Sequence, residues 1–177
     1  FFDMPVDNLF TTPIFTRYIK KNIKSKNFIC VSPDAGGIER TRGLAKKINA
    51  DLAIIDKRRP QAGKSQVMNI IGEVKNKDCI IVDDIIDSGG TIVNAAEALI
   101  KNGARDVYVF ITHAVLSGEA ISKIKKSKIK KLVITDSIDN SKRIKGINKI
   151  QVLTIAPLMA EAIKRISNST SVSDLFN

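Results

Sequence analysis

The residues best suited to chemistry lie in the segment IIVDDIIDSGGT, residues 80–91, where an apolar run leads directly into Asp83 and Asp84. A polar stretch then precedes a helical pattern, and it consists of Asp87, Ser88, Gly89, Gly90 and Thr91. Two glycines allow backbone N–H groups to close around an anion, and a helix N-terminus attracts negative charge. The segment therefore predicts a phosphate-binding loop with hydroxyl donors.

The paired carboxylates of Asp83 and Asp84 suit the hydroxyls of a sugar, or a metal ion held through water. At the end of a buried strand they would be costly without such partners. The alternative is an ordinary turn in which Asp87 or Ser88 caps the following helix. The whole combination is more specific than a glycine pair alone.

A second candidate is VSPDAGG, residues 31–37, where another strand pattern meets a glycine-rich turn before a helix. The turn consists of Asp34, Ala35, Gly36 and Gly37. Its N–H groups can contact a diphosphate, and Asp34 is a candidate magnesium ligand because Mg²⁺ prefers carboxylate, water and phosphate oxygens. A plain strand-to-helix turn is the alternative.

A third candidate is IDKRRP, residues 55–60, in which Lys57, Arg58 and Arg59 directly follow a strand pattern. In a parallel sheet these cations would face the same crevice as the two loops above. There they could neutralise charge that develops during phosphoryl transfer. Ordinary surface charge is the alternative.

Two other sequence features give weaker evidence for a function. Residues 62–65, AGKS, end like a Walker A loop, but Arg58 stands where that motif needs its first glycine, so we reject an ATP P-loop. His113 is the only histidine and lies at a strand end. It has either a structural or a substrate-adjacent role, and a Ser-His-Asp hydrolase is unsupported.

The elements that must position these residues alternate between apolar runs and amphipathic stretches. Strands are expected at residues 28–32, 52–56, 67–71, 79–82, 107–111, 132–135 and 152–155, and helices at 38–48, 91–101, 118–126 and 157–167. Strands that are apolar on both faces and separated by helices indicate an α/β doubly wound, mostly parallel sheet with helices on both faces. We expect one domain over residues 1–177, with an irregular lead-in at 1–12 and a polar tail at 168–177.

Composition narrows the class further. The 177 residues are 44% hydrophobic and carry a net charge of +11. The densest run of lysines, residues 123–131, is interleaved with Ile124 and Ile129 and is typical of a solvated surface, so we expect no nucleic-acid partner. No apolar stretch approaches the length of a membrane span, and Cys30 and Cys79 lie in apolar runs typical of buried strand cysteines. A cytoplasmic protein without a membrane partner is expected.

The segment VDDIIDSGGT resembles the ribose 5-phosphate loop of type I phosphoribosyltransferases and ribose-phosphate pyrophosphokinases. Further segments resemble the pyrophosphokinase family alone, in its order: FFDMPVDNL, VSPDAGG, IDKRRP, QVMNIIGEV, THAVLSG, MAEAIKRIS and SVSDLF. The resemblance covers essentially the whole chain and corresponds to the carboxy-terminal half of that family. It implies a type I phosphoribosyltransferase-like fold.

The resemblance also implies residue roles. Lys57 and Arg59 would be catalytic. Arg59 would also contact ribose 5-phosphate, together with Asp83, Asp84 and residues 87–91. Asp34 would be the Mg²⁺ ligand of a diphosphate loop at 34–37. Inorganic phosphate or ADP would act as an effector at an allosteric site that includes Asn8, Ser171, Ser173 and Phe176.

The implied reaction moves the diphosphoryl group of MgATP to ribose 5-phosphate, in a homo-oligomer that is a hexamer in the full-length family. The chain lacks the family's amino-terminal ATP-binding half, so we expect it to be inactive in isolation. Ser88 stands where the family usually has Thr, Ala114 where it often has Pro or Gly, and residues 62–64 are atypical. Two alternatives remain, a nucleobase phosphoribosyltransferase and a non-catalytic regulatory relative.

Overall fold

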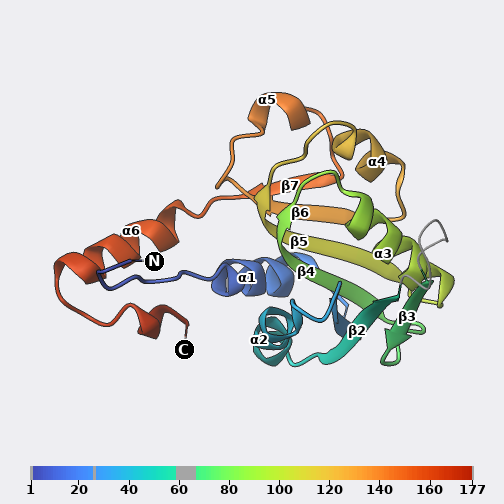
Figure 1. The fold of residues 1–177 in the computed structure, drawn as a ribbon, viewed down its shortest axis with the longest axis horizontal. Helices are drawn as coiled ribbons and strands as arrows, with labels where there is room; N and C mark the ends of the chain where they lie inside the picture. Colours follow the sequence, from blue (N-terminus) through green and yellow to red (C-terminus); the bar gives the residue numbers. More distant parts are fainter. Residues whose placement is uncertain (1, 26, 59–66, 177) are drawn as a thin grey trace.

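The computed structural model describes residues 2–25, 27–58 and 67–176, which form a seven-stranded sheet flanked by helices (Figure 1). The strand order is β3-β2-β1-β4-β5-β6-β7. The strands are β1 (Phe28–Ser32), β2 (Asp51–Arg58), β3 (Val67–Ile71), β4 (Asp78–Ile86), β5 (Asp106–Ala114), β6 (Lys131–Thr135) and β7 (Ile150–Leu153). All neighbours run parallel except β2 and β3, which are antiparallel. The predicted mostly parallel sheet is confirmed.

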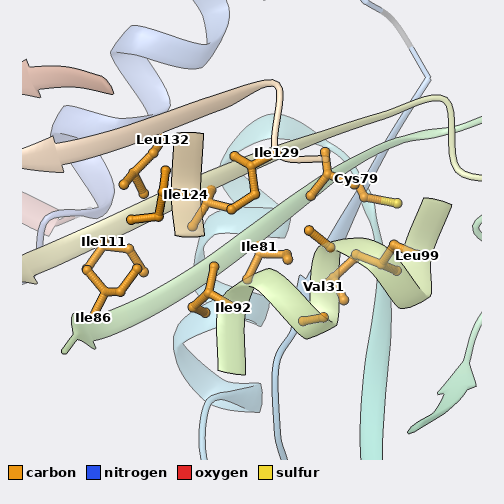
Figure 2. Close-up of a cluster of buried hydrophobic side chains, with 14 of the residues drawn as sticks. Val31, Cys79, Ile81, Ile86, Ile92, Leu99, Ile111, Ile124, Ile129 and Leu132 are labelled. Atoms are coloured by element: carbon orange, nitrogen blue, oxygen red, sulfur yellow. The ribbon is translucent and has the colours of Figure 1, made fainter. Parts of the chain in front are cut away.

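Helices cover both faces of the sheet, because successive strand residues point to opposite sides. On one face, α1 (Thr12–Asn22) and α2 (Ile38–Ile48) contribute Phe15 and Leu44 to a buried cluster that contains Ile80 of β4. On the other face, α3 (Gly90–Lys101) and α4 (Ala120–Lys126) pack on a larger cluster that contains Ile81 (Figure 2). The predicted doubly wound α/β arrangement is therefore confirmed.

Three smaller or peripheral elements complete the described chain: α5 (Ser141–Ile144), α6 (Ala156–Ser167) and the 3₁₀ helix η1 (Ser173–Phe176). Helix α6 extends away from the sheet (Figure 1). Only Ala162 of α6 is buried, whereas Met159, Ile163 and Ile166 are exposed.

The order of the strands creates a switch point between β1 and β4. From β1 the chain passes through α2 to β2, whereas from β4 it passes through α3 to β5 on the other side. The loops after these two adjacent parallel strands therefore diverge in opposite directions. Ligands of open α/β sheets bind in the crevice at such a point, outside the carboxyl ends of the strands.

Several element boundaries differ from the sequence expectations. Strand β4 does not end at Val82 but continues through Asp83 and Asp84, because Ile85 and Ile86 pair with the equally long β5. The two carboxylates are thus held by the sheet itself, which fixes their backbone more firmly than a loop would.

The last strand is shifted as well. It occupies Ile150–Leu153 and not 152–155, because the carboxylate of Asp136 accepts the N–H of Ile155 at 2.8 Å and ends the ladder. Helix α1 was not predicted, although Pro13 stands in its first turn and Phe15 and Ile19 lie buried one turn apart.

The predicted buried cysteines and the predicted solvated surface of the lysine-rich run are both observed. Cys30 and Cys79 are buried free thiols, and burial raises the pKa of each to about 12. Within the lysine-rich run, Ile124 and Ile129 are buried while the neighbouring Lys125, Lys126 and Lys128 are exposed.

Candidate functional site

The turn after β1 is held rigidly by its own polar groups. The N–H of Gly37 donates to Asp34 Oδ1 at 3.1 Å, and the buried Ser32 hydroxyl donates to the Asp34 carbonyl at 2.7 Å. Thr41, also buried, closes the turn onto α2 by donating to the carbonyl of Gly37 at 2.9 Å. A Cβ at Gly37 would lie 2.9 Å from the Ser32 hydroxyl, so the turn needs a glycine there.

The loop after β4 leads into α3 through a left-handed residue. Gly89, with φ of 77°, is the N-cap of α3, and its backbone conformation is one that L-residues adopt only with strain. The N-cap is thus Gly89 and not Asp87 or Ser88, so the alternative in which one of those residues is the capping residue is not what forms. The first N–H groups of α3 are consequently available to an anion.

The paired carboxylates of β4 are bound by a residue that the sequence analysis did not single out. Arg40 of α2 donates from Nη1 to Asp83 Oδ1 at 2.7 Å and from Nη2 to Asp84 Oδ2 at 2.9 Å. One guanidinium therefore bridges the helix that follows the Asp34 turn and the end of β4. The missed signal was a cation in the first turn of a helix, where the macrodipole disfavours positive charge and an outside carboxylate is needed.

The two carboxyl groups titrate differently. Burial raises the pKa of Asp83 to about 6, with a further rise from the charge of Asp84 and an opposing effect of Arg40. Burial also acts to raise the pKa of Asp84, but its hydrogen bond with Asp83 and the charge of Arg40 outweigh that effect, and the pKa is lowered. The pair thus binds one proton unusually tightly and the second weakly.

The third candidate segment is only partly described. The backbone of Lys57 lies near the carboxyl end of β2, which pairs with β1 through Ile54 and Ser32. Lys57 therefore follows the same sheet edge as the Asp34 turn, on the neighbouring strand. Arg59 lies outside the described residues.

A cavity of about 640 Å³ adjoins Asp84, the more exposed member of the carboxylate pair. Asp84, Arg40 and Gly36 line one part of it. His113 lines it as well, and its Nδ1 lies 3.0 Å from the hydroxyl of Ser137. His113 is therefore next to the candidate site.

The candidate effector residues lie near the two ends of the chain. Asn8 and Phe176 also line the 640 Å³ cavity, and the ring of Phe176 contacts that of Phe10 edge-on at 5.5 Å. Ser171 and Ser173 are joined by a hydroxyl–hydroxyl hydrogen bond of 2.9 Å. The amino-terminal segment and the carboxy-terminal tail thus meet at the cavity beside Asp84, although they are far apart in sequence.

A magnesium site has to be judged by the chemistry of the donors. Across the described ranges, no three or more His, Cys, Asp or Glu side chains are grouped so that they could hold a metal. Mg²⁺ commonly uses only one or two carboxylates and takes its other oxygens from phosphates and water. The carboxylate of Asp34, fixed in a turn suited to a diphosphate, fits that pattern. Among the same residues, no helix has the length and apolarity to cross a bilayer.

Comparison with known proteins gives a consistent family. The family model described as phosphoribosyl synthetase-associated domain matches residues 57–177. Over its whole length the chain is 53% identical to the ribose-phosphate pyrophosphokinase of Rhizobium meliloti (strain 1021) and 52% identical to that of Granulibacter bethesdensis. In both cases it spans 57% of the relative's length.

Solved structures agree on the fold. A phosphoribosylpyrophosphate synthetase from Mycobacterium smegmatis matches with a TM-score of 0.85 at 33% identity, over 95% of this chain and 54% of that one. A purine phosphoribosyltransferase from Pyrococcus horikoshii matches with a TM-score of 0.53 at 17% identity, over 81% of this chain and 84% of that one. The second likeness concerns the fold alone.

Proposed function

The chain belongs to the phosphoribosyl synthetase-associated domain family, and we propose that it is the sugar-phosphate-binding part of a ribose-phosphate pyrophosphokinase. That enzyme would transfer the diphosphoryl group of MgATP to the anomeric hydroxyl of ribose 5-phosphate and release AMP. The observation that carries the proposal is the geometry at the switch point. The strands β1 and β4 are neighbours in the sheet. A turn suited to diphosphate follows β1, and the end of β4 carries the carboxylate pair and leads to the N-terminus of α3.

The sugar phosphate would bind along the end of β4. Asp83 and Asp84 would accept hydrogen bonds from ribose hydroxyls, since each carboxylate has several lone pairs. The 5-phosphate would lie against residues 87–91, where the N–H groups of α3 and the hydroxyls of Ser88 and Thr91 can donate. Arg59 would add a cation to this subsite.

The diphosphoryl group would lie against the turn of residues 34–37. Magnesium bound by Asp34 and phosphate oxygens would neutralise charge on the diphosphoryl group. Lys57 and Arg59 would stabilise the charge that develops as the anomeric oxygen attacks the β-phosphorus and AMP departs. The chain's contribution is thus mainly the placement of two anionic groups side by side.

Assembly and regulation form part of the same proposal. The exposed apolar side chains of α6 support a homo-oligomer, which we propose to be the hexamer of the full-length family. Inorganic phosphate or ADP would act as an effector near Asn8, Ser171, Ser173 and Phe176. The cytoplasm, which supplies ATP and keeps thiols reduced, is the proposed compartment.

An isotope assay tests the reaction. The longest protein that the gene encodes is incubated with Mg²⁺, ribose 5-phosphate and ATP labelled at the β-phosphate. Label is expected in a sugar diphosphate, and AMP should form in equal amount. Pyrophosphate release in a parallel incubation with phosphoribosyl pyrophosphate and a nucleobase, without label transfer from ATP, would instead indicate a phosphoribosyltransferase. Binding of phosphates without turnover would indicate a regulatory relative.

A further inference from the structure

The guanidinium of Arg40 lies between the side chains of Asp83 and Asp84. Among the described residues, it is the cation that forms ion pairs with these two carboxylates. Its two terminal nitrogens reach different residues, at 2.7 Å to Asp83 and at 2.9 Å to Asp84. The Asp83 side chain is 17% exposed and that of Arg40 is 32% exposed, so the contact is partly shielded from water. Such a charge-assisted, two-pronged contact requires the planar fork of Arg.

The contact uses one defined oxygen of each carboxylate. Asp83 Oδ1 accepts both Arg40 Nη1 and the backbone N–H of Asp84, and Asp84 Oδ2 accepts Arg40 Nη2. Each carboxylate also retains further lone pairs for other donors. With Arg40 bound, the net charge of the cluster is −1 in place of the −2 of the two carboxylates alone, and the carboxylates keep free acceptor positions.

We propose that Arg40 is a specificity-determining residue that keeps divalent cations off the Asp83–Asp84 pair and reserves the pair for uncharged hydroxyl donors. Two adjacent carboxylates are the ligand type that Mg²⁺ and Mn²⁺ prefer. With Arg40 in place, a divalent ion would have to displace the guanidinium or lie beside its positive charge. A sugar hydroxyl meets no such repulsion and can add to the remaining lone pairs.

This role rests on the proposed function and makes it more specific. The reaction needs magnesium close by, at Asp34 and the phosphates, yet two carboxylates on the neighbouring strand could bind the same ion. Arg40 lies in the first turn of α2, the helix that directly follows the loop of residues 34–37. A single side chain thus divides the crevice into a metal-binding half and a sugar-binding half.

The test compares Arg40→Gln with Arg42→Gln in the longest form of the protein. Arg42 is exposed on the same helix, so the second variant loses the same charge without the contact. Bound Mn²⁺ is counted by electron paramagnetic resonance in the absence of nucleotide. Arg40→Gln should gain one Mn²⁺ per chain relative to the wild type, Arg42→Gln should gain none, and Arg40→Gln/Asp84→Asn should lose the gained site.

Ribose 5-phosphate binding is measured by calorimetry on the same proteins. In Arg40→Gln, added Mn²⁺ should weaken ribose 5-phosphate binding by about tenfold, the size expected for losing a hydrogen bond to a charged group. The wild type should not respond in this way. If Arg40→Gln gains no Mn²⁺, or if its gained ion leaves sugar binding unchanged, the proposal is overturned.

The experiments distinguish a failure of the proposed function from a failure of the proposed role of Arg40. If the wild type binds no ribose 5-phosphate, the proposed function fails, and the Mn²⁺ count alone then decides whether Arg40 excludes cations. Thermal melting verifies that each variant folds. Should Arg40→Gln not fold, Arg40→Lys replaces it, because Lys keeps the charge but cannot contact both carboxylates at once. A weaker gained Mn²⁺ site is then expected, and its absence counts against the proposal.

Discussion

Asp83 and Asp84 are neighbours in the chain, yet their carboxyl groups lie in different environments. The side chain of Asp83 is 17% exposed and that of Asp84 is 56% exposed. Desolvation and the like charge of Asp84 disfavour the charged form of the more buried Asp83, and the positive charge of Arg40 opposes both effects. Residue identity alone shows two equivalent acids, whereas their position on β4 makes them unequal.

A pH-dependent stability difference follows from this inequality. The pKa of Asp83 is about 6 in the folded protein, above about 3.9 in an unfolded chain. The folded form therefore binds this proton more tightly, and the stability that the proton contributes is present below pH 4 and lost as the pH rises through 6. The variant Asp83→Asn has no titrating group at this position, so it should not lose this stability as the pH rises.

The melting temperature measures this pH-dependent stability difference. The difference between Asp83→Asn and the wild type should be more favourable to the variant at pH 7.5 than at pH 4.5. Each kcal/mol would shift the midpoint by roughly 2–4 °C. A difference that is the same at both pH values would contradict the raised pKa.

Lys57 should contribute mainly to turnover. In the longest form of the protein, Lys57→Ala is expected to lower kcat by about 100-fold or more, because the proposed role of Lys57 is to stabilise charge in the transition state. The affinity for ribose 5-phosphate, measured by calorimetry, should change far less. Lys46→Ala, an exposed site on α2, is the control. Equal losses of turnover and of sugar-phosphate affinity would argue against a catalytic role.

At the scale of elements, the N-terminus of α3 depends on one backbone conformation. Gly89 has φ of 77°, while a Cβ there would meet only ordinary contacts at 3.7 Å with Ala120. Gly89→Ala should therefore destabilise the fold by about 1–2 kcal/mol through backbone strain alone. Because the strain is relieved by turning the first N–H groups of α3, phosphate binding should weaken as well.

Gly43→Ala supplies the matched comparison. Gly43 lies within α2 at ordinary φ, and a Cβ there would meet nothing within 4 Å. Alanine should stabilise the protein by about 0.5–1 kcal/mol at this position. Denaturant unfolding measures both variants, and effects of the same sign would contradict the assigned backbone conformations.

The elements were predictable where the pattern is local. The apolar spacing of residues 38–48 gives the bounds of α2, and continuous apolar runs locate the central strands. The end of β4 was not predictable, because it depends on pairing with β5, and neither was the end of β7, because it depends on Asp136. The candidate loops follow from glycine and acid patterns. Arg40 does not, because its partners are defined only once β1 and β4 lie side by side.

At the scale of the molecule, α6 presents an uncovered apolar surface. Ile163 is 63% exposed and Ile166 is 57% exposed, on a helix that extends away from the sheet (Figure 1). Large exposed apolar groups of this kind commonly mark contacts between proteins. A homo-oligomer would bury them.

Charge placed on α6 should therefore weaken assembly. Ile163→Glu combined with Ile166→Glu is expected to lower the molar mass in light scattering, since carboxylates would have to be desolvated at the contact. Lys164→Glu, an exposed site on the same helix, should leave the mass unchanged. An unaltered mass in the double variant would show that α6 is not at the interface.

The proposed transfer reaction requires the turn after β1 and the loop after β4 to form one site. Competition calorimetry with Mg²⁺ tests this most directly, using ribose 5-phosphate, inorganic diphosphate and phosphoribosyl pyrophosphate, which carries both groups. Phosphoribosyl pyrophosphate should bind more tightly than either separate ligand and should displace both. If it displaces only one of them, or binds no more tightly than ribose 5-phosphate, the two loops are separate sites and cannot together bind the substrates of the proposed reaction.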